Sequence, residues 1–397
     1  MPVVKCSDCS KKYNLRDDQL GRVKCKCGVL LTEAMITDAD APSKSVSGKD
    51  LADKAESMSD MERVKHLKDA YEKIRAEIGK VIVGQDNVIE EVMIGIFARG
   101  HCLLEGVPGL AKTLLISTIA ETLDMSFKRI QFTPDLMPSD ITGTEVIQED
   151  PDTHNRQFKF LQGPIFANLV LADEINRTPP KTQAAMLEAM QERRVSIGGK
   201  SYPLPKPFFV LATQNPLEQE GTYPLPEAQL DRFIFKIYVD YPEADEELEV
   251  MKRASAPSME SPAKVLEAEE VIQLQEIVRR VPVADHVFEY ARRLVRMTRP
   301  AKGEAPQFIM DWINWGAGPR ASINLILAAK ARSILYGNYH VSCEDIQAVA
   351  PAVMRHRIAC NFTAQAEGIT TDFVIARLIK EVPVNEKHAA PVGAKDE

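Results

Sequence analysis

The stretch Gly106-Val107-Pro108-Gly109-Leu110-Ala111-Lys112-Thr113 combines residue types that bind phosphate. It matches the phosphate-loop pattern Gly-x-x-x-x-Gly-Lys-Ser/Thr except at Ala111, where the pattern has glycine. A strand-like run precedes it, and apolar residues at helical spacing follow it. In a strand–loop–helix unit, backbone N–H groups and the helix N-terminus surround phosphates. Lys112 is therefore predicted to contact the β- and γ-phosphates, and Thr113 to bind Mg²⁺. The methyl group of Ala111 is expected to be tolerated only if φ is not positive.

Two carboxylates, Asp173 and Glu174, end a buried strand-like run that begins at Asn168. In an ATPase site, Asp173 would hold Mg²⁺ through water and Glu174 would polarise the attacking water. The alternative is an ordinary strand end with a capping aspartate. Asn215 ends the next apolar strand and either aligns that water or only begins an Asn-Pro turn. Arg320 stands near a helix start, where its charge opposes the helix dipole and favours a bound anion such as a nucleotide phosphate.

Four of the seven cysteines crowd the first 27 residues as two close pairs, Cys6-x-x-Cys9 and Cys25-x-Cys27. This spacing predicts a structural Zn²⁺ site with four thiolate ligands, although the second pair is tighter than the usual Cys-x-x-Cys. The segment has too few apolar residues for a core, so metal binding would supply most of its folding free energy. The three other cysteines lie in apolar segments and are predicted to be core thiols.

The elements that must position these residues follow the order strand, helix, strand, insertion, strand, helix, strand, strand. This order predicts an α/β domain with a parallel sheet whose strand ends collect the site. The insertion at 133–165 contains an expected hairpin, and a second hairpin with a Gly-Gly turn is expected at 195–202. We predict five segments: a zinc-ribbon-like module at 1–37, a flexible linker at 38–58, the α/β core at 59–241, helices at 242–381 and a disordered tail at 382–397.

Composition limits the classes of function. The net charge of −8 gives no overall basic field, so a nucleic-acid partner is not expected. No run of 18 apolar residues exists, so no membrane span is expected. The N-terminus lacks the apolar core of a signal peptide, which indicates a cytoplasmic location.

Taken together, these motifs resemble those of the MoxR family of AAA+ ATPases, over residues 62 to 380. The resemblance rests on six motifs: Gly-Val-Pro-Gly-Leu-Ala-Lys-Thr at 106–113, Arg-Ile-Gln-Phe-Thr-Pro-Asp-Leu-Met-Pro-Ser-Asp at 129–140, Gly-Pro-Ile-Phe at 163–166, Ala-Asp-Glu-Ile-Asn-Arg at 172–177, Ala-Thr-Gln-Asn-Pro at 212–216 and Leu-Pro-Glu-Ala-Gln-Leu-Asp-Arg-Phe at 225–233. The family has alanine at the position of Ala111. The resemblance implies a P-loop ATPase core with a five-stranded parallel sheet and a C-terminal all-α lid, and the N-terminal zinc ribbon is not a standard part of the family.

The resemblance also implies roles for single residues. Lys112 and Thr113 look like Walker A, Asp173 and Glu174 like Walker B, and Asn215 like sensor 1. Arg232 looks like an arginine finger offered to a neighbour's nucleotide, and Arg320 like sensor 2, although Gly318 replaces the family's serine. The implied nucleotide contacts are Ile82, Val83 and Gly84 at the adenine, and Gly106, Val107, Pro108, Gly109, Leu110, Ala111, Lys112, Thr113 and Leu114 at the phosphates. The insertions at 133–165 and 195–207 look like pore-facing inserts.

By this resemblance, ATP and Mg²⁺ bind between the α/β core and the lid of one subunit, and a neighbour supplies Arg232 within a hexameric ring. Hydrolysis would then remodel a protein client during maturation, including cofactor or metal insertion. A partner with a von Willebrand A domain is expected. Two alternatives stay open: a nucleic-acid-binding AAA+ motor or regulator that uses the zinc ribbon, and a magnesium-chelatase-like subunit that differs mainly in its client.

Overall fold

The computed structural model describes residues 3–5, 12–14, 60–107, 109–149, 156–216, 221–255, 260–302 and 304–384. The chain divides into two compact units, 1–59 and 60–397, which are described separately. In the first unit, β1 (Val3–Lys5) pairs antiparallel with β2 (Lys12–Asn14). The predicted zinc ligands Cys6, Cys9, Cys25 and Cys27 lie outside the described residues, as do the linker at 38–58 and residues 385–397.

The second unit is built around a five-stranded parallel sheet with the order β11-β3-β10-β7-β4. Its strands are β3 (Cys102–Glu105), β4 (Phe127–Gln131), β7 (Leu169–Asp173), β10 (Phe209–Gln214) and β11 (Phe235–Tyr238). Gln131 lies opposite Asp173, and Gln214 lies opposite Glu105, so the carboxyl ends of these strands form one edge. The predicted parallel sheet is confirmed, and its strand ends gather the polar residues that the sequence singled out.

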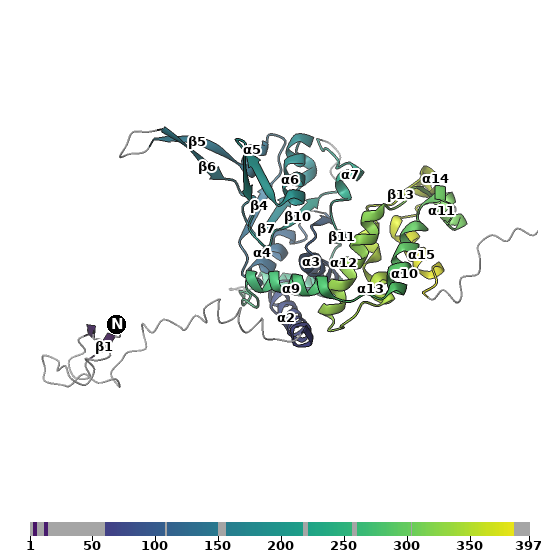
Figure 1. Cartoon of the computed structure of the whole chain (residues 1–397), viewed down its shortest axis with the longest axis horizontal. Helices are drawn as coiled ribbons and strands as arrows, with labels where there is room; N and C mark the ends of the chain where they lie inside the picture. The colour runs from purple at the N-terminus through teal and green to yellow at the C-terminus, as the bar shows by residue number, and fades with distance from the viewer. Residues whose placement is uncertain are drawn as a thin grey trace, which may run out of the picture. The chain divides into compact units, whose positions relative to one another are not determined.

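Helices cover both faces of the sheet because its strands bury side chains on both sides. In β3, for example, Cys102 and Leu104 join one apolar cluster whereas Leu103 joins another. The first cluster packs under α2 (Asp60–Val81), α3 (Asp86–Phe97) and α4 (Lys112–Thr122). The second packs under α6 (Pro180–Glu192), on the opposite side of the sheet in Figure 1. The core is therefore a three-layer α/β sandwich.

Two hairpins project from this core, as the sequence predicted. One follows α5 (Pro138–Thr142) and pairs β5 (Gly143–Glu149) with β6 (Arg156–Gln162); the other pairs β8 (Arg194–Ile197) with β9 (Lys200–Pro203). The rings of Phe160 and Tyr202 stack with centroids 4.2 Å apart, which joins the two hairpins. Farther along the β5–β6 hairpin, Ile147 and Phe158 lie directly opposite each other and are 63% and 71% exposed.

The C-terminal part is helical and packs on the core. Its helices are α8 (Ala244–Ala254), α9 (Ala268–Arg280), α10 (Asp285–Arg296), α11 (Gln307–Trp312), α12 (Pro319–Leu335), α13 (Cys343–Met354), α14 (Phe362–Ala366) and α15 (Thr371–Glu381). A short antiparallel pair joins β12 (Ile313–Trp315) to β13 (Ala359–Cys360). Helix α12 contacts α2 and α3, and one apolar cluster runs from the sheet into this lid.

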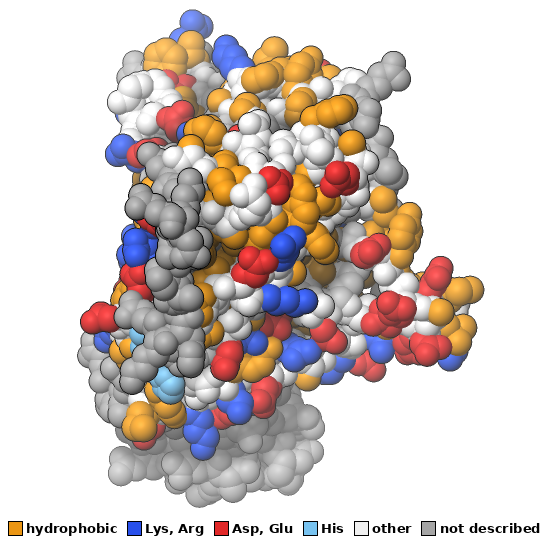
Figure 2. Space-filling model, turned by 90° about the vertical axis from the view of Figure 1, so that its right-hand side faces the viewer, with side chains coloured by type: hydrophobic (Ala, Val, Ile, Leu, Met, Phe, Trp, Pro, Cys, Tyr) orange, Lys and Arg blue, Asp and Glu red, His pale blue; other side chains and the backbone are white. Residues whose placement is uncertain are grey.

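Seen from the lid side, the molecule shows hydrophobic side chains between charged ones (Figure 2). Among the exposed large hydrophobic residues of the lid are Met310, Trp315, Phe362 and Phe373. None of the described helices has the length and apolar character needed to cross a membrane.

Candidate active site

The phosphate loop connects the end of β3 to the start of α4. A side chain at Gly106 would put its Cβ 2.4 Å from the carbonyl oxygen of Val239, so only glycine fits there. The N–H of Gly106 donates to the carbonyl of Gln214 (3.4 Å), which ties the loop to β10. Ala111 has φ 51° and ψ 23°, in the left-handed region. The expectation that alanine requires a negative φ at this position is therefore wrong, and the loop holds the alanine in a conformation that favours glycine.

The ammonium group of Lys112 lies at the start of α4 and donates to the carbonyl oxygen of Gly106 (2.5 Å). Burial lowers the pKa of Lys112, whereas the nearby Asp173 and Glu174 carboxylates oppose that shift. No described carboxylate lies within ion-pair distance of Lys112. A partly buried cation whose hydrogen-bond acceptor is neutral is suited to bind an anion.

The donor set around the loop fits a nucleotide with Mg²⁺. It consists of the Lys112 ammonium, the Thr113 hydroxyl and the Asp173 carboxylate, the hard nitrogen and oxygen groups that phosphates and Mg²⁺ prefer. Within the loop, Leu110 is buried and Val107 is partly buried, and Leu114, the residue that follows the loop, is exposed. Pro108 lies outside the described residues.

Asp173 ends β7, and both of its carboxylate oxygens accept hydrogen bonds. Arg129 of β4 donates to Oδ2 from Nε (2.9 Å) and from Nη2 (2.6 Å). The hydroxyl of Thr213 on β10 donates to Oδ1 (2.6 Å). Asp173 is therefore held between the two strands that flank β7.

Glu174 follows in a left-handed conformation with φ 58°. Its N–H donates to the hydroxyl oxygen of Thr213 (2.8 Å), and its Oε2 accepts from Nε2 of Gln131 (2.7 Å). Arg177 also pairs with this oxygen (3.1 Å). Gln131 in turn accepts at Oε1 from Nη2 of Arg129 (2.5 Å), so the two acidic residues belong to one hydrogen-bonded network.

No role was predicted from the sequence for four neighbours of these carboxylates: Arg129, Gln131, Arg177 and Thr213. A signal for two of them was present, because Arg129 and Gln131 alternate along β4 and so lie on one face of that strand, at its carboxyl end. Asn215 follows β10 at the same edge of the sheet and is 5% exposed.

The segment expected at the adenine lies next to the phosphate loop. The side-chain amide of Gln85 donates to the carbonyl of Leu110 (3.3 Å), which connects the two. Ile82 is buried, whereas Val83 and Gly84 are partly exposed. Gly84 has φ 65°, and a Cβ there would meet the carboxylate of Glu246 on α8. Helix α8 therefore covers this segment.

Arg232 and Arg320 lie at the other end of the sheet. Both line a cavity of about 410 Å³ together with Gly100 and His101, which come just before β3. Gly106 comes just after β3, so the strand separates this cavity from the phosphate loop by roughly 13 Å at 3.3 Å per residue. Arg320 pairs with Asp231 (3.4 Å). Arg320 is therefore placed away from the phosphate loop of its own subunit.

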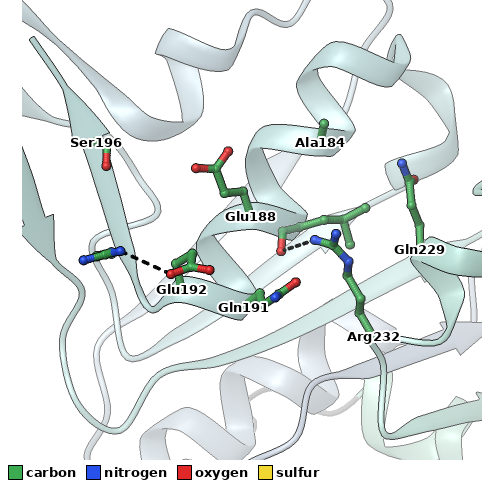
Figure 3. A pocket seen from close by; sticks show the side chains of 9 residues that line it. Ala184, Glu188, Gln191, Glu192, Ser196, Gln229 and Arg232 are labelled. Atoms are coloured by element: carbon green, nitrogen blue, oxygen red, sulfur yellow. Dashed lines mark hydrogen bonds and ion pairs between the residues drawn. The ribbon is translucent and has the colours of Figure 1, made fainter. Parts of the chain in front are cut away.

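Arg232 follows the short helix α7 (Glu227–Leu230) and donates from Nη1 to the carbonyl of Leu187 on α6 (3.1 Å). In Figure 3 its guanidinium points toward α6, with Glu188 and Gln229 beside it. These residues line a second cavity, of about 530 Å³. The chain thus holds Arg232 at a surface that is far from its own phosphate loop.

Comparison with known proteins identifies the family. Residues 101–235 match the model of an ATPase family associated with various cellular activities (AAA), and residues 311–378 match an AAA lid domain. The chain is 43% identical over 315 residues to Chaperone MoxR1 of Mycobacterium tuberculosis, an alignment that covers 79% of this chain and 82% of that protein. The chain belongs to the MoxR family of AAA+ ATPases.

Other MoxR relatives match over similar lengths. Protein MoxR of Methylorubrum extorquens is 34% identical over 303 residues, covering 73% of this chain and 88% of that protein. A crystal structure of a Cytophaga hutchinsonii protein has a TM-score of 0.76 and 43% identity, and it covers 85% of this chain and 99% of that one. The two matched family segments contain Lys112, Thr113, Asp173, Glu174, Asn215, Arg232 and Arg320, whereas residues 1–59 lie outside both.

Proposed function

We propose that this MoxR-family protein hydrolyses ATP at the carboxyl edge of its sheet. The observation that carries the proposal is the partly buried Lys112 ammonium at the start of α4, whose hydrogen-bond acceptor is the neutral carbonyl of Gly106, with the carboxylates of Asp173 and Glu174 near enough to act on its charge. Lys112 would bind the phosphates, Glu174 would orient the attacking water and accept its proton, and Asn215 would align that water. Thr113 and Asp173 would hold Mg²⁺, which neutralises charge on the phosphates when bound.

A neighbouring subunit would complete this site with Arg232 and Arg320. The support is their position, because both arginines lie at the amino end of the sheet, away from their own phosphate loop. The cavity that they line also contains Arg99 and Arg193, and Asp231 is the carboxylate among its described lining residues. This excess of positive charge suits the phosphates of a nucleotide that is bound to the phosphate loop of a second subunit. A head-to-tail ring, with six subunits as the expected number, would supply every site with these arginines.

The ring would use hydrolysis to remodel a protein client during maturation, which includes the insertion of a cofactor or metal. The relative in Mycobacterium tuberculosis carries the name chaperone. The two stacked hairpins support a client-contacting role, since Ile147 and Phe158 expose apolar surface on one of them. A partner with a von Willebrand A domain remains part of the proposal. So does a zinc-stabilised N-terminal module that docks to a protein, with Cys6, Cys9, Cys25 and Cys27 as the proposed ligands.

Replacement of Glu174 by glutamine tests the proposal. Glu174→Gln should keep ATP binding and lower turnover by about 10²- to 10⁴-fold, because the general base is lost. Lys112→Ala serves as the comparison that should lose nucleotide binding. Hydrolysis by Glu174→Gln at the parental rate would show that the site is assigned incorrectly. The same variant, loaded with ATP, should retain protein clients in a pull-down; retention of nucleic acid in their place would overturn the client class.

A further inference from the structure

We infer that Arg129 is a built-in counter-ion of Asp173 that competes with Mg²⁺, and that it links metal binding at Asp173 to the position of Glu174. The inference rests on the proposed ATPase function and concerns a residue to which the family motifs assign no role. Arg129 comes from the edge strand β4, outside the Walker A and Walker B segments.

The competition follows from how the oxygens of Asp173 are used. Thr213 donates to Oδ1, and two N–H groups of Arg129 donate to Oδ2 at 2.9 and 2.6 Å. At Oδ2 the guanidinium already uses both lone pairs, so a divalent cation, or a water of its hydration shell, must displace Arg129 there or take the second lone pair of Oδ1 directly beside it. Two positive groups at one carboxylate also repel each other. Binding of Mg²⁺ should therefore displace or weaken the Arg129 contact.

Displacement is feasible because Arg129 lies at the surface. Its side chain is 48% exposed, whereas that of Asp173 is 13% exposed. An ion pair with one exposed partner contributes little stability, and a released guanidinium can be hydrated. Arg129 can leave without breaking the core, while Asp173 keeps its bond to Thr213.

The link to Glu174 runs through the amide of Gln131. Arg129 donates from Nη2 to Oε1 of that amide (2.5 Å), and Nε2 of the same amide donates to Oε2 of Glu174 (2.7 Å). An amide has one acceptor end and one donor end. A guanidinium at the oxygen end thus directs the NH₂ end toward Glu174. When Arg129 moves, this orientation is no longer enforced, and one of the two groups that hold Oε2 of Glu174 is released, while Arg177 keeps its contact. Arg129 is thus a positioning residue.

Thermodynamic linkage measures the competition without relying on turnover. Calorimetry gives the Kd for ADP in EDTA and at saturating Mg²⁺. The Kd in EDTA divided by the Kd at saturating Mg²⁺ reports how strongly metal and nucleotide support each other's binding. Arg129→Gln should raise this ratio about 3- to 10-fold, because Asp173 loses its competing cation. Arg129→Lys keeps the positive charge but lacks the guanidinium whose N–H groups bridge Asp173 and Gln131, so this variant should give an intermediate ratio.

Lys128→Gln is the matched control. It removes the same charge from the adjacent residue of β4, whose side chain points to the other face of the strand. This variant should change the ratio by less than about twofold, since it affects only the long-range field. An equal rise in Lys128→Gln would overturn the inference, and so would an unchanged or lower ratio in Arg129→Gln.

Steady-state turnover separates the two parts of the inference. Arg129→Gln should lower the Mg²⁺ concentration that gives half-maximal turnover, whereas Gln131→Leu should change kcat and leave that concentration near the parental value. A shift of the Mg²⁺ requirement in Gln131→Leu as large as in Arg129→Gln would overturn the assignment of the competition to Arg129. A parent protein that binds no ADP in either buffer would instead overturn the proposed function itself.

Discussion

Ala111 is the residue at which the phosphate loop departs from the usual glycine pattern, and it is also strained. Its φ of 51° lies in a region that costs an L-residue roughly 1–2 kcal/mol. The neighbouring Gly109, with φ 89°, meets the same demand without a side chain. Among the described residues of the loop, Ala111 is therefore the strained one, directly before Lys112 at the N-cap of α4.

Reciprocal substitutions test this strain. Ala111→Gly should raise the free energy of unfolding by up to about 1 kcal/mol, because relief of the left-handed strain exceeds the added freedom of the unfolded chain. Gly109→Ala should lower it by about 1 kcal/mol through the backbone alone, since no atom lies within 4 Å of the added Cβ. Urea unfolding of the three proteins measures both effects. Destabilisation by Ala111→Gly would contradict the strain.

Sequence reasoning predicted the site residues that are local to a motif. Asp173, Glu174 and Asn215 lie at or directly after a strand end, and Lys112 follows the loop after β3; the parallel sheet brings those strand ends to one edge. The contact between Arg129 and Asp173 depends on the register of β4 against β7, which no local pattern encodes.

Among the elements, the two projecting hairpins are joined by the stack of Phe160 on Tyr202. A double-mutant cycle with Phe160→Ala and Tyr202→Ala should give a coupling energy of about 0.5–1.5 kcal/mol, the range found for aromatic pairs. The same cycle with Phe158→Ala and Tyr202→Ala serves as the control and should give a value near zero, because Phe158 is exposed and has no described ring contact to Tyr202. Equal coupling in both cycles would argue against a specific stack.

The turn between α3 and β3 contains a buried histidine that makes stability depend on pH. His101 accepts at Nδ1 from the N–H of Val210 (2.9 Å), which leaves Nε2 to donate to the carbonyl of Met190 (3.0 Å). Burial lowers its pKa from 6.5 to about 4. Between these values the unfolded chain binds more protons than the folded one, so stability is complete above pH 6.5 and is lost as the pH falls toward 4.

The loss attributable to His101 is about 3 kcal/mol. Denaturant unfolding at pH 7 and at pH 4.5 measures it. His101→Asn should flatten the dependence but not abolish it, because burial also lowers the pKa of His356. An unchanged pH dependence in His101→Asn would show that other groups cause the loss.

The longer helices were predictable from periodicity, whereas the short helices were not. The hairpin at β8 and β9 followed from its Gly-Gly turn, and both glycines have positive φ (57° and 76°). Helices α11 and α14 are too short for a helical repeat to stand out. The β12–β13 pair joins Ile313 to Cys360, and its formation depends on how the lid helices fold together.

For the whole molecule, the position of Arg320 could not be read from the sequence because it depends on the packing of α12. That helix lies against α2 and α3, and the lid shares one apolar cluster with the sheet. This packing brings Arg320 to Asp231 and Arg232, at the end of the sheet away from the phosphate loop.

Mixing two inactive variants tests whether the arginines act on a neighbour. Arg232→Ala keeps its own phosphate loop, and Lys112→Ala keeps its arginine, so about a quarter of the interfaces in an equal mixture would be complete. ATPase assays should show activity in the mixture that exceeds the sum of the two separate proteins. A mixture of Lys112→Ala with Glu174→Gln is the control and should stay inactive, because neither subunit has an intact hydrolytic site. No gain in the first mixture would argue against action between subunits.

The separation of the phosphate loop from Arg232 along β3 gives each subunit a direction. In the proposed ring, assembly would join unlike surfaces, so it would have no built-in stop until the first subunit meets the last. A closed circle of n subunits has n complete sites, whereas an open arc has n − 1, with one idle loop at one end and one idle arginine at the other. Opening a single interface would therefore inactivate a single ATPase site, so the turnover rate per subunit would report whether the ring is closed.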